Sequence, residues 1–277
     1  MRWEDLRPSG NVDDRRGFGG GGIRLAGGGG LGMLVVLGLS LFFGVDPSQL
    51  LGPMEGNAPI ERTAGPQAND PAFDFARRII GSAEDVWQPL LQARGARFAP
   101  ATFTTYDYAT PTACGQGQSA AGPFYCPGDA HIYIDLSFFN ELAGRFGAPG
   151  EFARAYVIAH EYGHHIQNLL GVMERRDMGA AGATGGSVRT ELQADCYAGI
   201  WAFHAQQRFN ILERGDVESG LAAAAAVGDD TLAKRGQGYA VPDSFTHGTS
   251  AQRMRWFRRG LDSGDPGSCD TFSAGQL

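Results

Sequence analysis

The chain has 277 residues and a formal net charge of −7. Hydrophobic residues make up 43% of it and aromatic residues 10%, which is ample for a buried core. There is no basic stripe to neutralise phosphates, so the composition argues against nucleic acid as a partner.

The N-terminal region predicts a leader followed by a membrane anchor. Glycine runs make residues 1–24 typical of a flexible leader. Residues 25–45 contain no charged side chain, and 21 helical residues span about 31 Å, enough for the hydrocarbon core of a bilayer. A cleaved signal peptide is the alternative, but the segment after the apolar run offers no A-x-A-like site.

Charge predicts the orientation of this anchor. Five arginines precede it, whereas the next basic residue after it is Arg62. We therefore expect a single crossing of the cell membrane, with a cytoplasmic N-terminus and an extracytoplasmic catalytic domain. Four prolines between residues 46 and 69 indicate a linker, so the folded domain should comprise residues 70–277.

The first half of this domain predicts helices and a small sheet. Asp70 followed by Pro71 predicts a helix to about Ile80, and Ser82 can cap a second helix to about Arg94. Strands are expected at residues 97–108 and 130–136, and a helix at residues 137–146. The second strand either holds a substrate in extended form at an exposed edge or is an ordinary half-buried strand. The fold class expected is α+β and mostly helical, with a small antiparallel sheet.

The four cysteines all follow the predicted anchor, and none forms a C-x-x-C pattern. An even number in an exported domain suggests two disulfides, Cys114 with Cys126 and Cys196 with Cys269. Four reduced and buried thiols in a cytosolic protein are the alternative.

Residues 150–170 predict a buried helix that carries an HExxH motif. His160 and His164 are four residues apart and therefore lie on one face, while Glu161 is turned about 100° away from His160. This pattern is the signature of zinc proteases. The alternative is a core helix whose three polar residues are satisfied incidentally.

The next predicted helix, residues 187–209, supplies two carboxylates on one face. Glu191 can give a third ligand to the metal, and Asp195 can accept the free ring N–H of a ligating histidine. Three protein ligands and one open position are typical of a catalytic zinc site. We therefore predict one Zn²⁺ per chain, bound by His160, His164 and Glu191.

Two further helices are expected, at residues 216–227 and from Ser250 through Phe257. His247 lies in the loop before the last helix, and we expect it to stabilise the oxyanion of a tetrahedral intermediate, with Tyr239 as the other candidate. The remaining histidines are expected to be structural: His131, His165 and His204.

The chain resembles the bacterial neutral zinc metallopeptidase family in several segments: RWEDLRPSGNVDDRRG, FYCPGDAHIYIDLSFF, AYVIAHEYGHHIQ, ELQADCYAGIWA and SFTHGTSAQRMRWF. The resemblance implies a membrane-anchored zinc peptidase with a glutamate-zincin arrangement, in which Glu191 is the third ligand and Asp195 lies behind a histidine. It implies no particular substrate.

The function expected is therefore hydrolysis of peptide bonds, with Glu161 as the general base that activates a water. Two alternatives remain open at this point. One is a catalytically inactive, zinc-stabilised binding module at the membrane, and the other is a zinc amidase that acts on cell-wall peptides.

Overall fold

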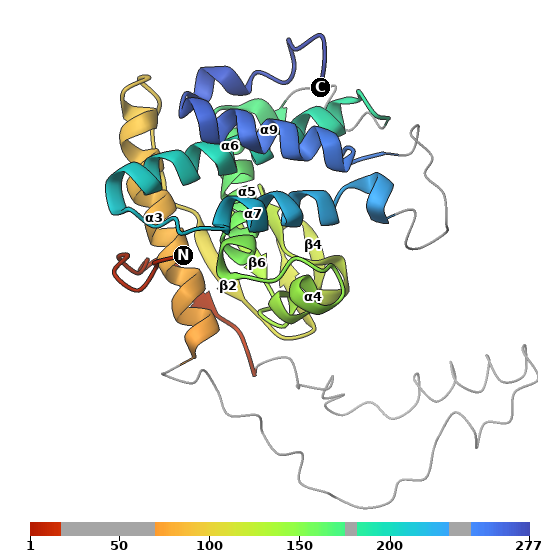
Figure 1. Cartoon of the computed structure of the whole chain (residues 1–277). Helices are drawn as coiled ribbons and strands as arrows, with labels where there is room; N and C mark the ends of the chain where they lie inside the picture. Colours follow the sequence, from red (N-terminus) through yellow and green to blue (C-terminus); the bar gives the residue numbers. More distant parts are fainter. Residues whose placement is uncertain (18–69, 175–181, 233–244) are drawn as a thin grey trace, which may run out of the picture. The chain divides into compact units, whose positions relative to one another are not determined.

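The computed structural model describes residues 1–17, 70–174, 182–232 and 245–277 (Figure 1). These residues form an α+β and mostly helical fold with two small sheets, as predicted. The predicted anchor at residues 25–45 and linker at residues 46–69 lie outside the described residues. None of the helices in the described ranges has the length and apolar character needed to cross a membrane.

Helix α3, Pro71–Gln92, begins where the sequence predicts. The Asp70 carboxylate accepts hydrogen bonds from the backbone N–H groups of Ala72 and Phe73 and so caps the helix. The prediction of a second helix starting at Ser82 is wrong, because α3 is continuous through this residue. The Ser82 hydroxyl donates to the carbonyl of Ile79 and accepts from the Trp201 indole, so it serves the core rather than a helix end.

The main sheet has four strands in the order β1-β2-β6-β5. Their bounds are Val12–Asp14 for β1, Thr102–Thr105 for β2, Phe124–Cys126 for β5 and His131–Ile134 for β6. The main sheet is mixed and not antiparallel as predicted, because β1–β2 and β2–β6 pair in parallel and only β5–β6 is antiparallel. A separate antiparallel hairpin joins β3, Ala109–Thr112, to β4, Gly115–Gln118.

This strand order changes which strand could hold a substrate. The strand predicted for that role contains β6, which lies between β2 and β5 and has both backbone edges paired. The end strands are β1 and β5. Strand β5 was not predicted, because its three residues are too few to show alternation.

Residues 1–17 belong to the same compact unit as residues 70–277. The prediction of a separate leader is therefore wrong for this segment. Besides the pairing of β1 with β2, the segment packs along α3. The Ser9 hydroxyl donates to the buried carboxylate of Glu84 over 2.6 Å, and the Arg7 guanidinium donates to Glu84 and Asp85, each over 2.8 Å. A Cβ atom on Gly81 would lie 2.1 Å from the Arg7 carbonyl oxygen, so only glycine admits this approach.

Helices from the second half of the chain form the layer that carries the histidines and carboxylates of the predicted site. Their bounds are Phe138–Gly144 for α4, Glu151–Leu169 for α5, Gly186–Phe209 for α6, Asp216–Ala226 for α7 and Ser250–Ser263 for α9. Helices α6 and α9 lie side by side (Figure 1). A Cβ on Gly163 would lie 2.9 Å from the Ala194 carbonyl oxygen, so this glycine lets α5 and α6 approach closely. The close approach falls between His160 and His164 on α5 and beside Asp195 on α6.

Both predicted disulfides are present. Cys114 and Cys126 join the hairpin region to β5, whereas Cys196 and Cys269 join α6 to the C-terminal tail. Helix α9 is capped by Thr249 rather than by Ser250 as predicted. The reason is that the Ser250 hydroxyl donates to the carbonyl of Ala225 and so ties α9 to α7.

Candidate metal centre

Helices α5 and α6 bring three predicted ligands together. The Nε2 atom of His160 lies 3.2 Å from one carboxylate oxygen of Glu191, and the Nε2 atom of His164 lies 3.4 Å from the other. Each of the three residues offers one ligand atom, and these three atoms all lie within 4.8 Å of one another. The three side chains therefore converge on one point, as predicted from the i, i+4 spacing of the two histidines on α5 and from the place of Glu191 on α6.

The donor set and its spacing fit a zinc ion. Two neutral imidazoles and one carboxylate are the ligands of a common class of catalytic zinc sites. Ligand atoms placed tetrahedrally about 2.1 Å from an ion lie about 3.4 Å apart, which matches the separations between Glu191 and the two imidazoles. His160, His164 and Glu191 are thus the residues that would hold the ion.

A buried ionic network fixes the orientation of His160. The Nδ1–H group of His160 donates to the Asp195 carboxylate over 2.8 Å. A carboxylate only accepts, so Nδ1 carries a proton and Nε2 is the ring atom left to face a metal. Asp195 lies where the sequence predicts, behind a ligating histidine.

Arg253 of α9 completes this network. Its Nε and Nη2 atoms each donate to Asp195 over 2.8 Å, and the Tyr156 hydroxyl donates to the same carboxylate. Burial alone would raise the pKa of Asp195, but the charge of Arg253 and the hydrogen bonds from Arg253 and His160 outweigh it and hold that pKa below its ordinary value. Asp195 is therefore an anion that can only accept from His160.

A neutral network fixes His164. Its Nδ1–H group donates to the amide oxygen of Gln167 over 2.8 Å. The Gln167 amide nitrogen donates to the Thr190 carbonyl over 2.7 Å, so the amide cannot be turned around without losing both bonds. The ring therefore presents Nε2 to Glu191, as the ring of His160 does.

Glu161 lines the same cleft as the three ligands and is itself buried. Burial raises the pKa of its carboxyl group above the ordinary value, although the neighbouring His160 and His164 act in the opposite direction. A carboxylate with a raised pKa is a stronger base than an exposed one, which suits proton abstraction.

His247 also lines the cleft, as the sequence predicts. One oxygen of Asp229 accepts from the backbone N–H groups of residues 246, 247 and 248, over 2.7, 2.6 and 2.9 Å. The other oxygen lies 3.2 Å from Nδ1 of His247, and its hydrogen bond raises the pKa of the imidazole. Asp229 therefore holds the whole loop and orients the ring. The other candidate for this role, Tyr239, lies outside the described residues.

The remaining histidines have structural partners elsewhere. His165 donates to the Ala99 carbonyl over 2.7 Å, and its burial lowers the pKa of the ring. His204 bonds to the carbonyl of Gly264, and His131 to the hydroxyl of Thr104. None of the three is among the residues that line the cleft.

Several residues of these networks were not predicted from the sequence, among them Gln167, Asp229 and Arg253. Arg253 had a signal, because it shares a helical face with Trp256, Phe257 and Gly260, and a charge on a buried face needs a partner. Gln167 had a weaker signal, since it follows His164 by three residues. Asp229 had none, because its partners come from a loop that follows it by seventeen residues.

Comparison with known proteins agrees with this geometry. Residues 1–272 match the model of a family described as "Putative neutral zinc metallopeptidase". The uncharacterized protein YpfJ of Escherichia coli K12 is 46% identical over 285 residues, covering 98% of this chain and 99% of its own. The uncharacterized protein Rv2575 of Mycobacterium tuberculosis is 47% identical over 206 residues, covering 71% of this chain and 69% of its own. No solved structure matches.

The family model spans nearly the whole chain, including the N-terminal segment and both helices that carry the His160, His164 and Glu191 cluster. The chain therefore belongs to the neutral zinc metallopeptidase family.

Proposed function

We propose that the protein is a zinc-dependent endopeptidase. The observation that carries this proposal is the convergence of two Nε2 atoms and the Glu191 carboxylate beside Glu161, in one cleft. A structural zinc site has four protein ligands and needs no neighbouring base. Here three ligands leave a position open, and Glu161, a buried carboxylate whose pKa is raised by burial, lines the same cleft.

The reaction follows from the roles of these side chains. When bound, zinc supplies Lewis acidity that polarises the scissile carbonyl and makes a water molecule more acidic. Glu161 takes a proton from the attacking water and then delivers it to the nitrogen of the leaving amine. His160 and His164 are held in fixed orientations, with Nε2 toward the metal position, because Asp195 and Gln167 each accept a hydrogen bond from Nδ1 of one ring.

His247 supports the developing negative charge. Its raised pKa favours a protonated ring that donates from Nε2, while Asp229 holds Nδ1. A fixed donor that faces the carbonyl oxygen of the substrate stabilises the transition state more than the ground state. We therefore assign to His247 the role of oxyanion donor.

The cleft favours extended peptides with apolar side chains. Strand β5 ends the sheet and borders the cleft with Phe124 and Tyr125, so its edge can pair with a substrate backbone. The rings of Phe138 and Phe146 lie 6.0 Å apart, and both residues line the same cleft, as does Val157. Val157 precedes Glu161 by one helical turn, which puts an apolar side chain on the same side of α5 as the base.

We also propose that residues 25–45 attach the protein to a membrane, with residues 1–17 and 70–277 on the same side of it. The pairing of β1 with β2 and the bonds of Ser9 and Arg7 to Glu84 support this arrangement, because a membrane cannot separate paired strands. This arrangement differs from the one predicted from the sequence, in which the anchor crosses the membrane once and the N-terminus is cytoplasmic. Two disulfides favour an oxidising compartment for both parts.

Glu161→Gln should abolish peptide cleavage while zinc stays bound. The amide keeps the size of the side chain but cannot accept the proton, so we expect a loss of about 10²-fold or more in kcat. The measurement is cleavage of a broad peptide library by the full-length protein, with zinc content determined in parallel. Glu218→Gln, on the exposed face of α7, is the control and should cleave like the wild type. Equal cleavage by the Glu161 variant would rule out this mechanism.

Arg253→Gln should weaken zinc binding by about 10- to 100-fold, the usual effect of disturbing a partner of a ligating histidine. Without the guanidinium, Asp195 loses the charge that fixes it and His160 loses its defined orientation. Competition with a chelator measures the affinity. Arg258→Gln lies on the exposed side of the same helix and should bind zinc as the wild type does. Unchanged affinity in both variants would show that Arg253 has no such role.

His247→Ala should lower kcat by about 10²- to 10³-fold with zinc retained, which is typical of removing one oxyanion donor. Asp229→Asn should lower it less, because the ring remains but loses its charged partner. Steady-state kinetics on a peptide found in the library separates kcat from KM. If His247→Ala keeps activity within a few-fold of the wild type, the oxyanion role belongs to another group.

Single cysteines test the membrane arrangement. Asp5→Cys and Arg97→Cys place a thiol on exposed positions of the N-terminal segment and of the domain, in a chain whose own cysteines are all paired. A membrane-impermeant maleimide added to intact cells should label both variants. Labelling of one variant only would contradict the arrangement. Protection of both would keep the two parts together but place them in the cytoplasm.

A further inference from the structure

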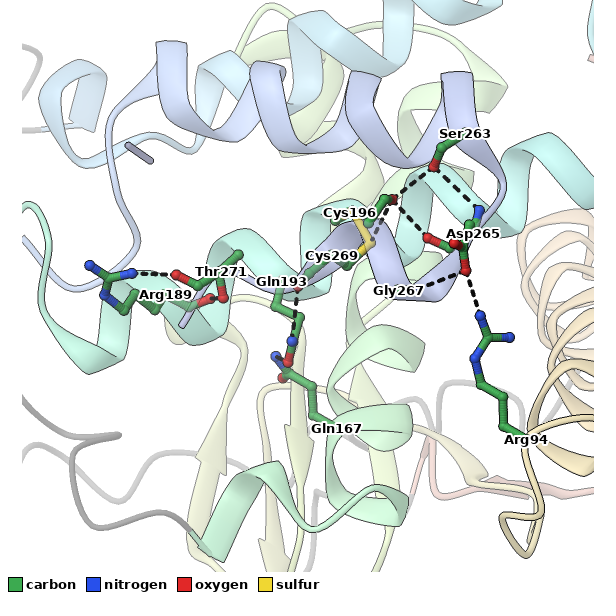
Figure 2. Close-up of a disulfide and its surroundings, with 11 residues drawn as sticks. Arg94, Gln167, Arg189, Gln193, Cys196, Ser263, Asp265, Gly267, Cys269 and Thr271 are labelled. Carbon is green, nitrogen blue, oxygen red and sulfur yellow. Dashed lines mark hydrogen bonds and ion pairs between the residues drawn. A yellow bond between two sulfur atoms is a disulfide. The ribbon is translucent and has the colours of Figure 1, made fainter. Parts of the chain in front are cut away.

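The C-terminal tail of the chain is held against α6 at two places. The Cys196–Cys269 disulfide joins it to the middle of the helix. Nearer the start of the helix, the Thr271 hydroxyl donates to the Arg189 carbonyl over 2.7 Å, and the Arg189 guanidinium donates to the Thr271 carbonyl (Figure 2). The tail is therefore fixed on the helix that carries Glu191.

A chain of buried hydrogen bonds runs from this tail to His164. The Cys269 carbonyl accepts from the Gln193 amide nitrogen over 3.0 Å, and the Gln193 oxygen accepts from the Gln167 nitrogen over 3.0 Å (Figure 2). The Gln167 oxygen in turn accepts from Nδ1 of His164 over 2.8 Å. Both glutamines are buried, so no bulk water competes for these bonds.

The direction of every bond in this chain is determined at its ends. The Cys269 carbonyl can only accept, which turns the Gln193 nitrogen toward it and the Gln193 oxygen toward Gln167. Gln167 must then present its nitrogen to Gln193 and its oxygen to the imidazole. The proton of His164 is thereby kept on Nδ1, and Nε2 keeps its lone pair for a metal.

We propose that Gln193 and Gln167 are positioning residues that transmit the placement of the disulfide-held tail to His164, and that zinc affinity depends on the Cys196–Cys269 bridge. The inference rests on the proposed metal centre. The proposed dependence on the tail concerns the orientation of His164 alone. His160 is held by the ion pair of Asp195 and Arg253 instead.

A double-mutant cycle on the full-length protein tests the proposal. Its three variants are Gln193→Leu, the double variant Cys196→Ser with Cys269→Ser, and the combination of all three substitutions. The probe is Zn²⁺ alone, with affinity measured by competition with a chelator. We expect Gln193→Leu and the cysteine variant each to lose about 10-fold or more in affinity, within the range usual for partners of a ligating histidine.

Non-additivity distinguishes transmission from a general loss of stability. If Gln193 carries the effect of the bridge, the combined variant should lose no more affinity than the weaker-binding of its two parents. The control variant, Cys114→Ser with Cys126→Ser, removes the other disulfide. That disulfide takes no part in the hydrogen bonds that link Cys269 to His164, so zinc affinity should stay within about two-fold of the wild type.

The outcomes separate this inference from the proposed function. Losses that multiply in the combined variant, or wild-type affinity in Gln193→Leu, would overturn the inference and leave the metal centre standing. Because Gln193→Leu keeps both disulfides, it tests the role of the hydrogen bonds even if the cysteine variant does not fold. A wild-type protein that binds no zinc would overturn the proposed function and this inference with it.

Discussion

The metal centre depends on the ion pair between Asp195 and Arg253. Both side chains are buried, and taking two charges out of water is unfavourable unless they meet in good geometry with all hydrogen bonds satisfied. The two parallel bonds from the guanidinium to the carboxylate meet this condition, and the Tyr156 hydroxyl donates to the same carboxylate. The Asp195 carboxylate thus joins three helices, since Tyr156 lies on α5, Asp195 on α6 and Arg253 on α9.

The two ligating histidines are held by different physical means. His160 donates to an anion, which increases the electron density on the ring and makes Nε2 a better ligand. His164 donates to a neutral amide that depends on a second amide and on a main-chain carbonyl. A pair of anions, one behind each imidazole, would add a further buried charge to the centre without a cation to compensate it. The amide chain orients the second ring without that charge.

Much of the centre could be predicted from the sequence because its information is local. His160 with His164, and Glu191 with Asp195, each follow the i, i+4 spacing of a single helix, so a helical pattern was enough to place them on one face. The partners that complete the centre come from distant parts of the chain. Arg253 and Cys269 reach α6 only through tertiary packing, which no local periodicity encodes. The helix at residues 71–92 was divided wrongly for a similar reason, since Ser82 has a cap-like side chain but a core partner, Trp201.

The sheet was the least predictable part of the fold, and its strand order bears on function. Parallel pairing joins strands that are distant in sequence, so the place of β1 beside β2 could not be inferred from the composition of a glycine-rich leader. The two ends of the sheet are also unlike. At one end β1 carries Asp13 and Asp14, and charged side chains discourage pairing with another chain. At the other end β5 presents Phe124 and Tyr125 to the cleft that contains Glu161. The proposed addition of an extended peptide is therefore disfavoured at the β1 edge and fits the β5 edge, which borders the same cleft as Glu161.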